Sequence, residues 1–129
     1  MFEYHGWVSV QDSPSDVDEK ELRAATELIR PRIEQLAETL GFAALNWVNG
    51  MPQVNVSGLL NRRSGGGDDV IDLFRFIGKV APGSYGVLYM HDDEGAHANE
   101  FRVLVLRRGA VSEQADPFLS PVVPTIEDE

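Results

Sequence analysis

The sequence predicts an α+β fold, with one largely antiparallel five-stranded sheet and two helices on one face. Five short segments are rich in aromatic and β-branched residues, which is typical of strands. Two longer segments repeat apolar residues every three or four positions, as helices do. Their order is β-α-β-β-α-β-β. The first six elements match the ferredoxin-like arrangement, to which we expect a C-terminal strand and an extended tail to be added.

The first strand and the first helix are predicted from residues 2–40. Residues 2–10 alternate between two sets of side chains, and only Trp7 breaks the polar face. Ser13 or Ser15 is expected to cap the helix, and Pro31 falls on its polar side, where it should bend the axis. One apolar stripe defines the buried side of this helix: Leu22, Ala25, Ile29, Ile33, Leu36 and Leu40.

A hairpin follows, because Asn49-Gly50 lies between two strand-like segments, residues 42–48 and 53–59. Asn-Gly is the strongest short hairpin signal, since both residues accept the positive φ that a tight turn requires.

The second half of the chain is predicted to begin with a mobile loop at residues 61–67, which contains three consecutive glycines. Asp68 is expected to cap the second helix, and Pro82-Gly83 to end it. Strands are predicted at residues 85–90 and 100–108. Residues 110–129 contain three prolines and five acids, so we expect an extended acidic tail that docks on a single domain spanning residues 1–129.

Composition excludes several classes of protein. The 129-residue chain has no cysteine, which excludes disulfides, thiolate nucleophiles and cysteine-ligated zinc. No signal peptide is expected, because the first residues lack a positively charged region and a following apolar region, and no apolar segment approaches the roughly 20 residues of a membrane helix. We therefore expect a cytoplasmic protein that does not bind membranes.

Charge is distributed unevenly along the chain. Eleven basic and 21 acidic residues give a net charge of −10. Residues 1–40 hold nine acids and four bases, residues 41–109 are balanced, and residues 110–129 hold five acids and no base. Such a chain repels nucleic acid and attracts a basic protein partner, although the same charge also serves solubility.

No segment carries a convincing catalytic motif. The segment from His91 to His97 is rich in potential metal ligands, but its spacing matches no zinc or EF-hand pattern, so neither a metal nor a cofactor is predicted. The glycines at 65–67 precede two aspartates, which would repel a phosphate. Trp7 and Trp47 are expected in the core rather than at a binding surface.

Several blocks of sequence together resemble the immunity protein 7 family of bacterial polymorphic-toxin and contact-dependent growth inhibition systems. The blocks cover nearly the whole chain: residues 2–7, 81–86, 88–89, 92–94, 99–101, 116–121 and 124–128. The resemblance implies a non-enzymatic protein that binds a cognate toxin domain, often a nuclease, and protects the producing cell. It brings no catalytic residues and no toxin-contacting residues that can be placed position by position.

Residue chemistry adds a hypothesis about the interface. A nuclease is basic where it holds nucleic acid, so carboxylates can mimic phosphates and cover that surface. Three acidic clusters are the candidates: Asp68 and Asp69; Asp92, Asp93 and Glu94; and Glu127, Asp128 and Glu129. Two alternatives remain. One is a small hydrolase or metal-dependent enzyme that uses His91, Asp92, Asp93 and His97. The other is a small ligand-sensing or metal-binding module that acts as a homodimer through its sheet.

Overall fold

The computed structural model describes residues 1–15 and 18–121, which form a six-stranded antiparallel sheet and two helices. The prediction of five strands is wrong by one, because residues 110–115 form a last strand instead of the start of an extended tail. In chain order the elements are β1 (Phe2–Ser9), α1 (Glu19–Thr39), β2 (Phe42–Val48), β3 (Met51–Leu60), α2 (Ser64–Val80), β4 (Tyr85–Asp92), β5 (Arg102–Arg107) and β6 (Ala110–Ala115).

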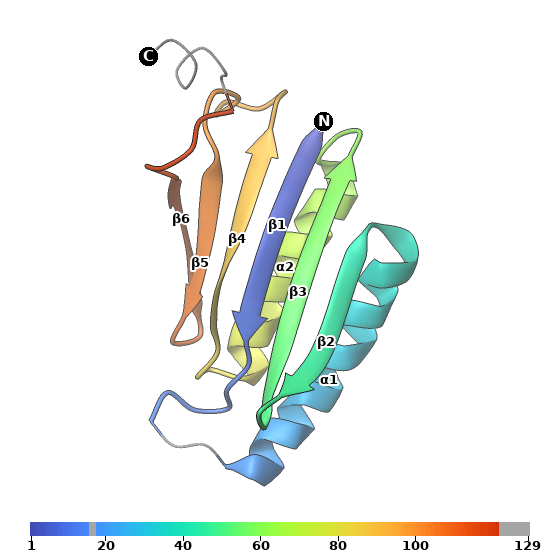
Figure 1. Ribbon diagram of the computed structural model, residues 1–129, viewed down its shortest axis with the longest axis vertical. Helices are drawn as coiled ribbons and strands as arrows, with labels where there is room; N and C mark the ends of the chain where they lie inside the picture. The colour runs from blue at the N-terminus through green and yellow to red at the C-terminus, as the bar shows by residue number, and fades with distance from the viewer. Residues whose placement is uncertain (16–17, 122–129) are drawn as a thin grey trace.

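The strands lie in the order β2-β3-β1-β4-β5-β6, and each neighbouring pair is antiparallel. Both helices lie on one face of this sheet, behind it in Figure 1. The α+β class, the two helices on one face and the order of the first seven elements are therefore confirmed. Within β2-β3-β1-β4, the strands and helices have the arrangement of a split β-α-β pair.

Two tight turns define the hairpins. Asn49 and Gly50 have φ values of 51° and 79°, so the predicted hairpin joins β2 to β3. Arg108 and Gly109 repeat this geometry, with φ values of 50° and 79°, between β5 and β6. Arginine is a rare residue in the left-handed region, which explains why sequence patterns did not indicate this second hairpin.

The core lies between the sheet and the helices. Phe2, Tyr4 and Val8 of β1 point toward the helices and are at most 1 % exposed. The predicted stripe of α1 is confirmed, since every member except the half-buried Leu40 is buried, and Pro31 is exposed inside the helix. None of the helices in the described part of the chain is long and apolar enough to cross a membrane.

Helix α1 begins later than predicted. Its N-cap is Asp18, whose Oδ1 accepts hydrogen bonds from the backbone N–H groups of Lys20 at 3.0 Å and Glu21 at 3.3 Å. The expected caps, Ser13 and Ser15, lie in the preceding connection. Asp18 satisfies two of the free N–H groups that every helix exposes at its start.

Helix α2 begins earlier than predicted, because the three glycines form its first turns instead of a mobile loop. The helix starts at Ser64, and Gly67 N–H donates to the carbonyl of Arg63 at 2.8 Å. A Cβ on Gly66 would lie 2.8 Å from Leu40, and one on Gly67 would lie 3.1 Å from the Phe2 ring. These glycines therefore allow the start of α2 to pack closely against its neighbours.

We expect Gly65→Ala to stabilise the protein by about 0.5–1 kcal/mol, because alanine restricts the unfolded chain and favours helix. Nothing lies within 4 Å of a Cβ built on Gly65, so the added methyl group meets no obstacle. Urea unfolding of both proteins measures the difference. A loop at this position would give no gain in the free energy of unfolding.

Tyr4 predicts a loss of stability at alkaline pH. Its side chain is 1 % exposed, and burial raises the pKa of its phenol above the ordinary value of 10.0. As the pH rises, the unfolded chain therefore releases the phenol proton at a lower pH than the folded chain does. The contribution of Tyr4 to the free energy of unfolding is constant below pH 10 and declines as the pH rises above 10. Urea unfolding at pH 8, 10 and 11 should show a steeper decline for the wild type than for Tyr4→Phe. Equal declines would contradict this assignment.

Candidate functional site

The carboxylates of Asp68 and Asp69 project from the second turn of α2. Both residues are exposed. Asp68 is not a cap, contrary to the prediction, since the N-cap position belongs to Arg63 and has no side-chain cap hydrogen bond. Instead, Asp68 Oδ1 accepts from Arg63 Nε at 3.2 Å, so its charge is partly neutralised. Asp69 has no ion-pair partner among the described residues.

The second acidic cluster lies where β4 ends. Asp92 closes the turn, because its Oδ1 accepts from the backbone N–H of Glu94 at 3.0 Å. Asp93 is paired with the amino group of Met1 at 2.6 Å, and this hydrogen bond raises the pKa of that amino group. Carboxylate oxygens of Asp92, Asp93 and Glu94 lie within 4.8 Å of one another, so this turn concentrates negative charge.

The two histidines of this segment do not join the carboxylates. His91 is buried, its Nε2 lies 2.8 Å from the Ala98 carbonyl, and its ring packs against Phe101. The Nδ1 of His97 lies 2.8 Å from Glu100. Among the described residues, the carboxylate cluster therefore contains neither His91 nor His97, the two imidazoles that the metal-site hypothesis requires.

The structure brings the two acidic clusters to the same end of the molecule. The start of α2 and the end of β4 both lie at the top in Figure 1. Arg63, which pairs with Asp68, lines one small cleft together with Asp92 and His97. Asp69, Asp92 and Glu94 have no ion-pair partner in the described part of the chain, and the Met1 amino group paired with Asp93 also attracts Asp92 and Glu94. The third predicted cluster, Glu127, Asp128 and Glu129, lies outside the described residues.

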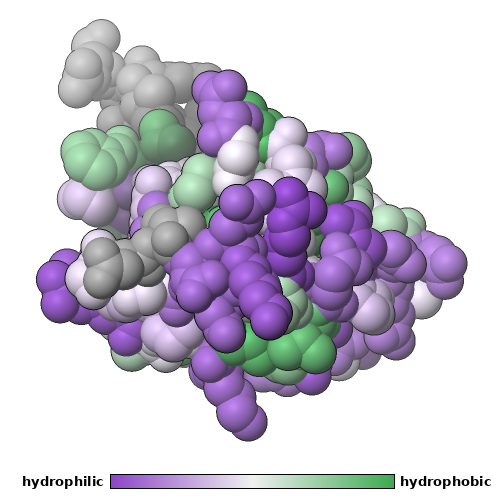
Figure 2. Space-filling view, turned by 90° about the horizontal axis from the view of Figure 1, so that it is seen from below, coloured by the Kyte–Doolittle hydropathy of each residue, from purple (hydrophilic) through white to green (hydrophobic). Residues whose placement is uncertain are grey.

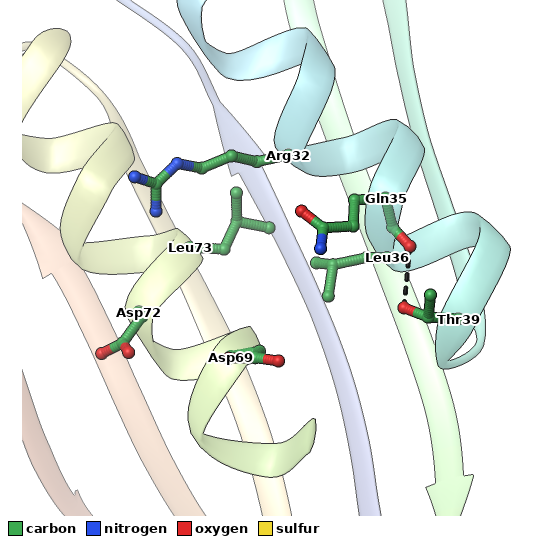
Figure 3. Close-up of a pocket in the computed structure, with 7 residues that line it drawn as sticks. All are labelled: Arg32, Gln35, Leu36, Thr39, Asp69, Asp72 and Leu73. Atoms are coloured by element: carbon green, nitrogen blue, oxygen red, sulfur yellow. Dashed lines mark hydrogen bonds between the residues drawn. The ribbon is translucent and has the colours of Figure 1, made fainter. Parts of the chain in front are cut away.

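A polar cleft between the helices extends this acidic end. It is lined by Arg32, Gln35, Leu36 and Thr39 of α1 and by Asp69, Asp72 and Leu73 of α2 (Figure 3). The Arg32 guanidinium stacks over the Phe76 ring at 3.7 Å, while Asp72 pairs with Arg75 at 3.1 Å.

Asp72 was not among the predicted residues. It follows Asp69 by three positions, which places both on one helix face. Both residues already fall inside the helix that the sequence predicts after Asp68, so this spacing could have identified Asp72.

The opposite end of the molecule also carries acidic residues, among them Asp18, Glu19 and Glu21 at the start of α1. Seen from below, its surface is mainly hydrophilic, with a few apolar patches (Figure 2). The start of α1 lies at this end in Figure 1, far from the acidic clusters at the top. Acidic residues of the first turns of α1, such as Glu21, are therefore suitable sites for control substitutions.

Both tryptophans are exposed, so their predicted place in the core is wrong. Trp7 is 42 % exposed on the sheet face that the helices do not cover, where it meets Tyr85 edge to face at 6.1 Å. Trp47 of β2 is 39 % exposed, and Arg23 lies 5.5 Å from the centre of its ring. Large aromatic side chains on a surface are frequent anchors of protein interfaces.

Comparison with known proteins gives one match. The family model described as Imm7, Immunity protein 7, matches residues 1–128, so the chain is similar to this family over almost its full length. No curated protein and no solved structure matches the chain.

Proposed function

Because the chain belongs to the immunity protein 7 family, we propose that it binds and neutralises a cognate bacterial toxin domain, and that this toxin is a basic nuclease. The family consists of non-enzymatic inhibitors, so the protein is not an enzyme and neutralisation follows from binding. In this proposal the protein acts in the cytoplasm of the producing cell, within a contact-dependent growth inhibition or related polymorphic-toxin system.

Family membership is the observation that carries the proposal, and the acidic end supports its mechanism. Five of the eight predicted carboxylates lie at one end of the molecule, and three of them have no ion-pair partner among the described residues. A net charge of −10 speeds the encounter with a basic surface. We therefore propose that Asp69, Asp92 and Glu94 contact the toxin where it would hold phosphates. In the same proposal Asp68 and Asp93 contribute less, because each already has a positive partner.

The exposed carboxylates also predict how toxin binding depends on the salt concentration. At physiological ionic strength, salt largely screens the attraction between an exposed carboxylate and a positive charge more than about 8 Å away. Charge-driven association with the toxin should therefore slow as salt is added, while contacts made after docking change less.

Growth rescue tests the proposal in cells. The toxin domain encoded immediately upstream of this chain's gene is expressed from an inducible promoter, with or without this chain. We expect the toxin domain to stop growth and co-expression of this chain to restore it. An unrelated acidic protein of similar size is the control for charge alone. Failure of this chain to restore growth, despite soluble expression, would contradict the proposed function.

A further inference from the structure

Strand β2 forms one edge of the sheet, and its outer side has no neighbouring strand among the described elements. It pairs residue for residue with β3 from Phe42 to Val48, so no bulge interrupts it. Its seven residues contain no charge and no proline. Phe42, Trp47 and Val48 are all exposed. Proteins usually protect sheet edges with charges, prolines or bulges, because an open edge is a template for another strand.

Backbone geometry shows which groups of β2 face outward. Val10 N–H donates to the Pro52 carbonyl at 3.0 Å, so the main-chain carbonyl of Pro52 points away from β2. Trp47 lies opposite Pro52, so its own N–H and C=O point away from β3. Because this direction alternates along an antiparallel strand, Leu45 and Ala43 also present both groups to the outer side.

Other parts of the described chain do not bond these outward groups. The alternate residues Ala44 and Asn46 face β3 and form the ladder within the sheet. The edge therefore offers three donors and three acceptors in a straight row, at the spacing that an added strand requires.

The other edge of the sheet differs in its side chains. Strand β6 contains Ser112, Glu113 and Gln114, all of them exposed. Glu113 forms an ion pair with Arg102 of β5 at 3.0 Å. This edge has the charged, polar character that discourages strand addition. The uncharged edge at β2 is thus the one suited to a partner strand.

We propose that the outer edge of β2 binds an extended strand of the toxin domain, by main-chain hydrogen bonds to Ala43, Leu45 and Trp47. This inference rests on the proposed function and specifies the second half of the interface. Charge favours the toxin over a second copy of this chain, since two copies of net charge −10 repel each other. The exposed Phe42 and Trp47 side chains flank the added strand and supply apolar contact at its two ends.

Amide hydrogen exchange of the full chain tests this edge directly. The ¹⁵N-labelled chain is measured alone and when saturated with the upstream-encoded toxin domain. We expect the amides of Ala43, Leu45 and Trp47 to exchange rapidly in the free chain and to slow by at least about tenfold in the complex. The amides of Ala44 and Asn46, already bonded to β3, are the internal control and should be slow in both states.

Each outcome has a distinct meaning. A saturated complex in which the three outward amides stay fast would overturn the edge proposal and leave the proposed function intact. Absence of any complex would overturn the proposed function and this inference with it. In the chain without toxin, exchange of these amides could also slow as the chain concentration rises. That result would assign the edge to a second copy and overturn the proposal.

A proline substitution provides a second measurement. Ala43→Pro removes one outward N–H without removing a hydrogen bond to β3. We expect toxin affinity to fall by roughly tenfold, while circular dichroism shows a folded protein. Unchanged affinity in the folded variant would contradict strand addition. If the variant does not fold, the exchange measurement on the unmodified chain still decides.

Discussion

Gly86→Ala is expected to destabilise the protein by about 3 kcal/mol, because the added methyl group would overlap the main chain of the neighbouring strand. Gly86, the second residue of β4, lies opposite Val8 of β1, and these are the two central strands of the sheet. A Cβ at this position would meet the Trp7 carbonyl oxygen, with the Val8 Cα only 2.8 Å away. These are backbone atoms of a central strand, which cannot rotate away as the end of a flexible side chain can.

Urea unfolding of Gly86→Ala, followed by circular dichroism, measures this effect. The control is Gly65→Ala, which makes the same chemical change where nothing lies within 4 Å. The two variants should shift the free energy of unfolding in opposite directions. Equal stability of Gly86→Ala and the wild type would contradict the close approach of β1 and β4 at this point.

Asp69→Lys combined with Glu94→Lys is expected to weaken toxin binding by roughly tenfold or more at low salt. Both side chains are exposed and lack ion-pair partners in the described part of the chain, so folding should not depend on their charge. Each substitution removes an attraction toward a basic surface and adds a repulsion. The loss should appear mainly in the association rate and should shrink as salt screens the charges.

The control for net charge is Glu21→Lys combined with Glu27→Lys, and circular dichroism checks its fold because Glu27 pairs with Arg30 at 3.3 Å. Each pair changes the net charge by four units, from −10 to −6, because −10 + 4 = −6. Glu21 and Glu27 lie in the first half of α1, which Figure 1 places toward the opposite end of the molecule. Equal losses of toxin affinity in the two double variants would show that net charge alone determines binding. No loss in the Asp69 and Glu94 pair would exclude these carboxylates from the interface.

Sequence patterns predicted the elements whose causes are local. The Asn49-Gly50 turn and the apolar stripe of α1 depend on neighbours in the chain, and both were confirmed. The start of α2 was missed because its glycines are selected by packing against Leu40 and Phe2, which are distant in sequence. Strand β6 was missed because its turn contains Arg108, an unfavourable residue at a positive φ.

The candidate site was predictable as a set of residues but not as a surface. Acidic runs at 68–69 and 92–94 are visible in the sequence, whereas their position at one end of the fold depends on strand order. The partners that weaken two of these charges, Arg63 and the amino group of Met1, also required the structure. The exposed edge of β2 could not be recognised without knowing which strand lies outermost.

The most direct test of the account is the activity of the upstream-encoded toxin domain, titrated with this chain in vitro. The account predicts that activity falls in proportion to added chain and reaches zero at an equimolar ratio, with a complex of the same ratio recovered by size-exclusion chromatography. Full toxin activity in the presence of excess folded chain would contradict it.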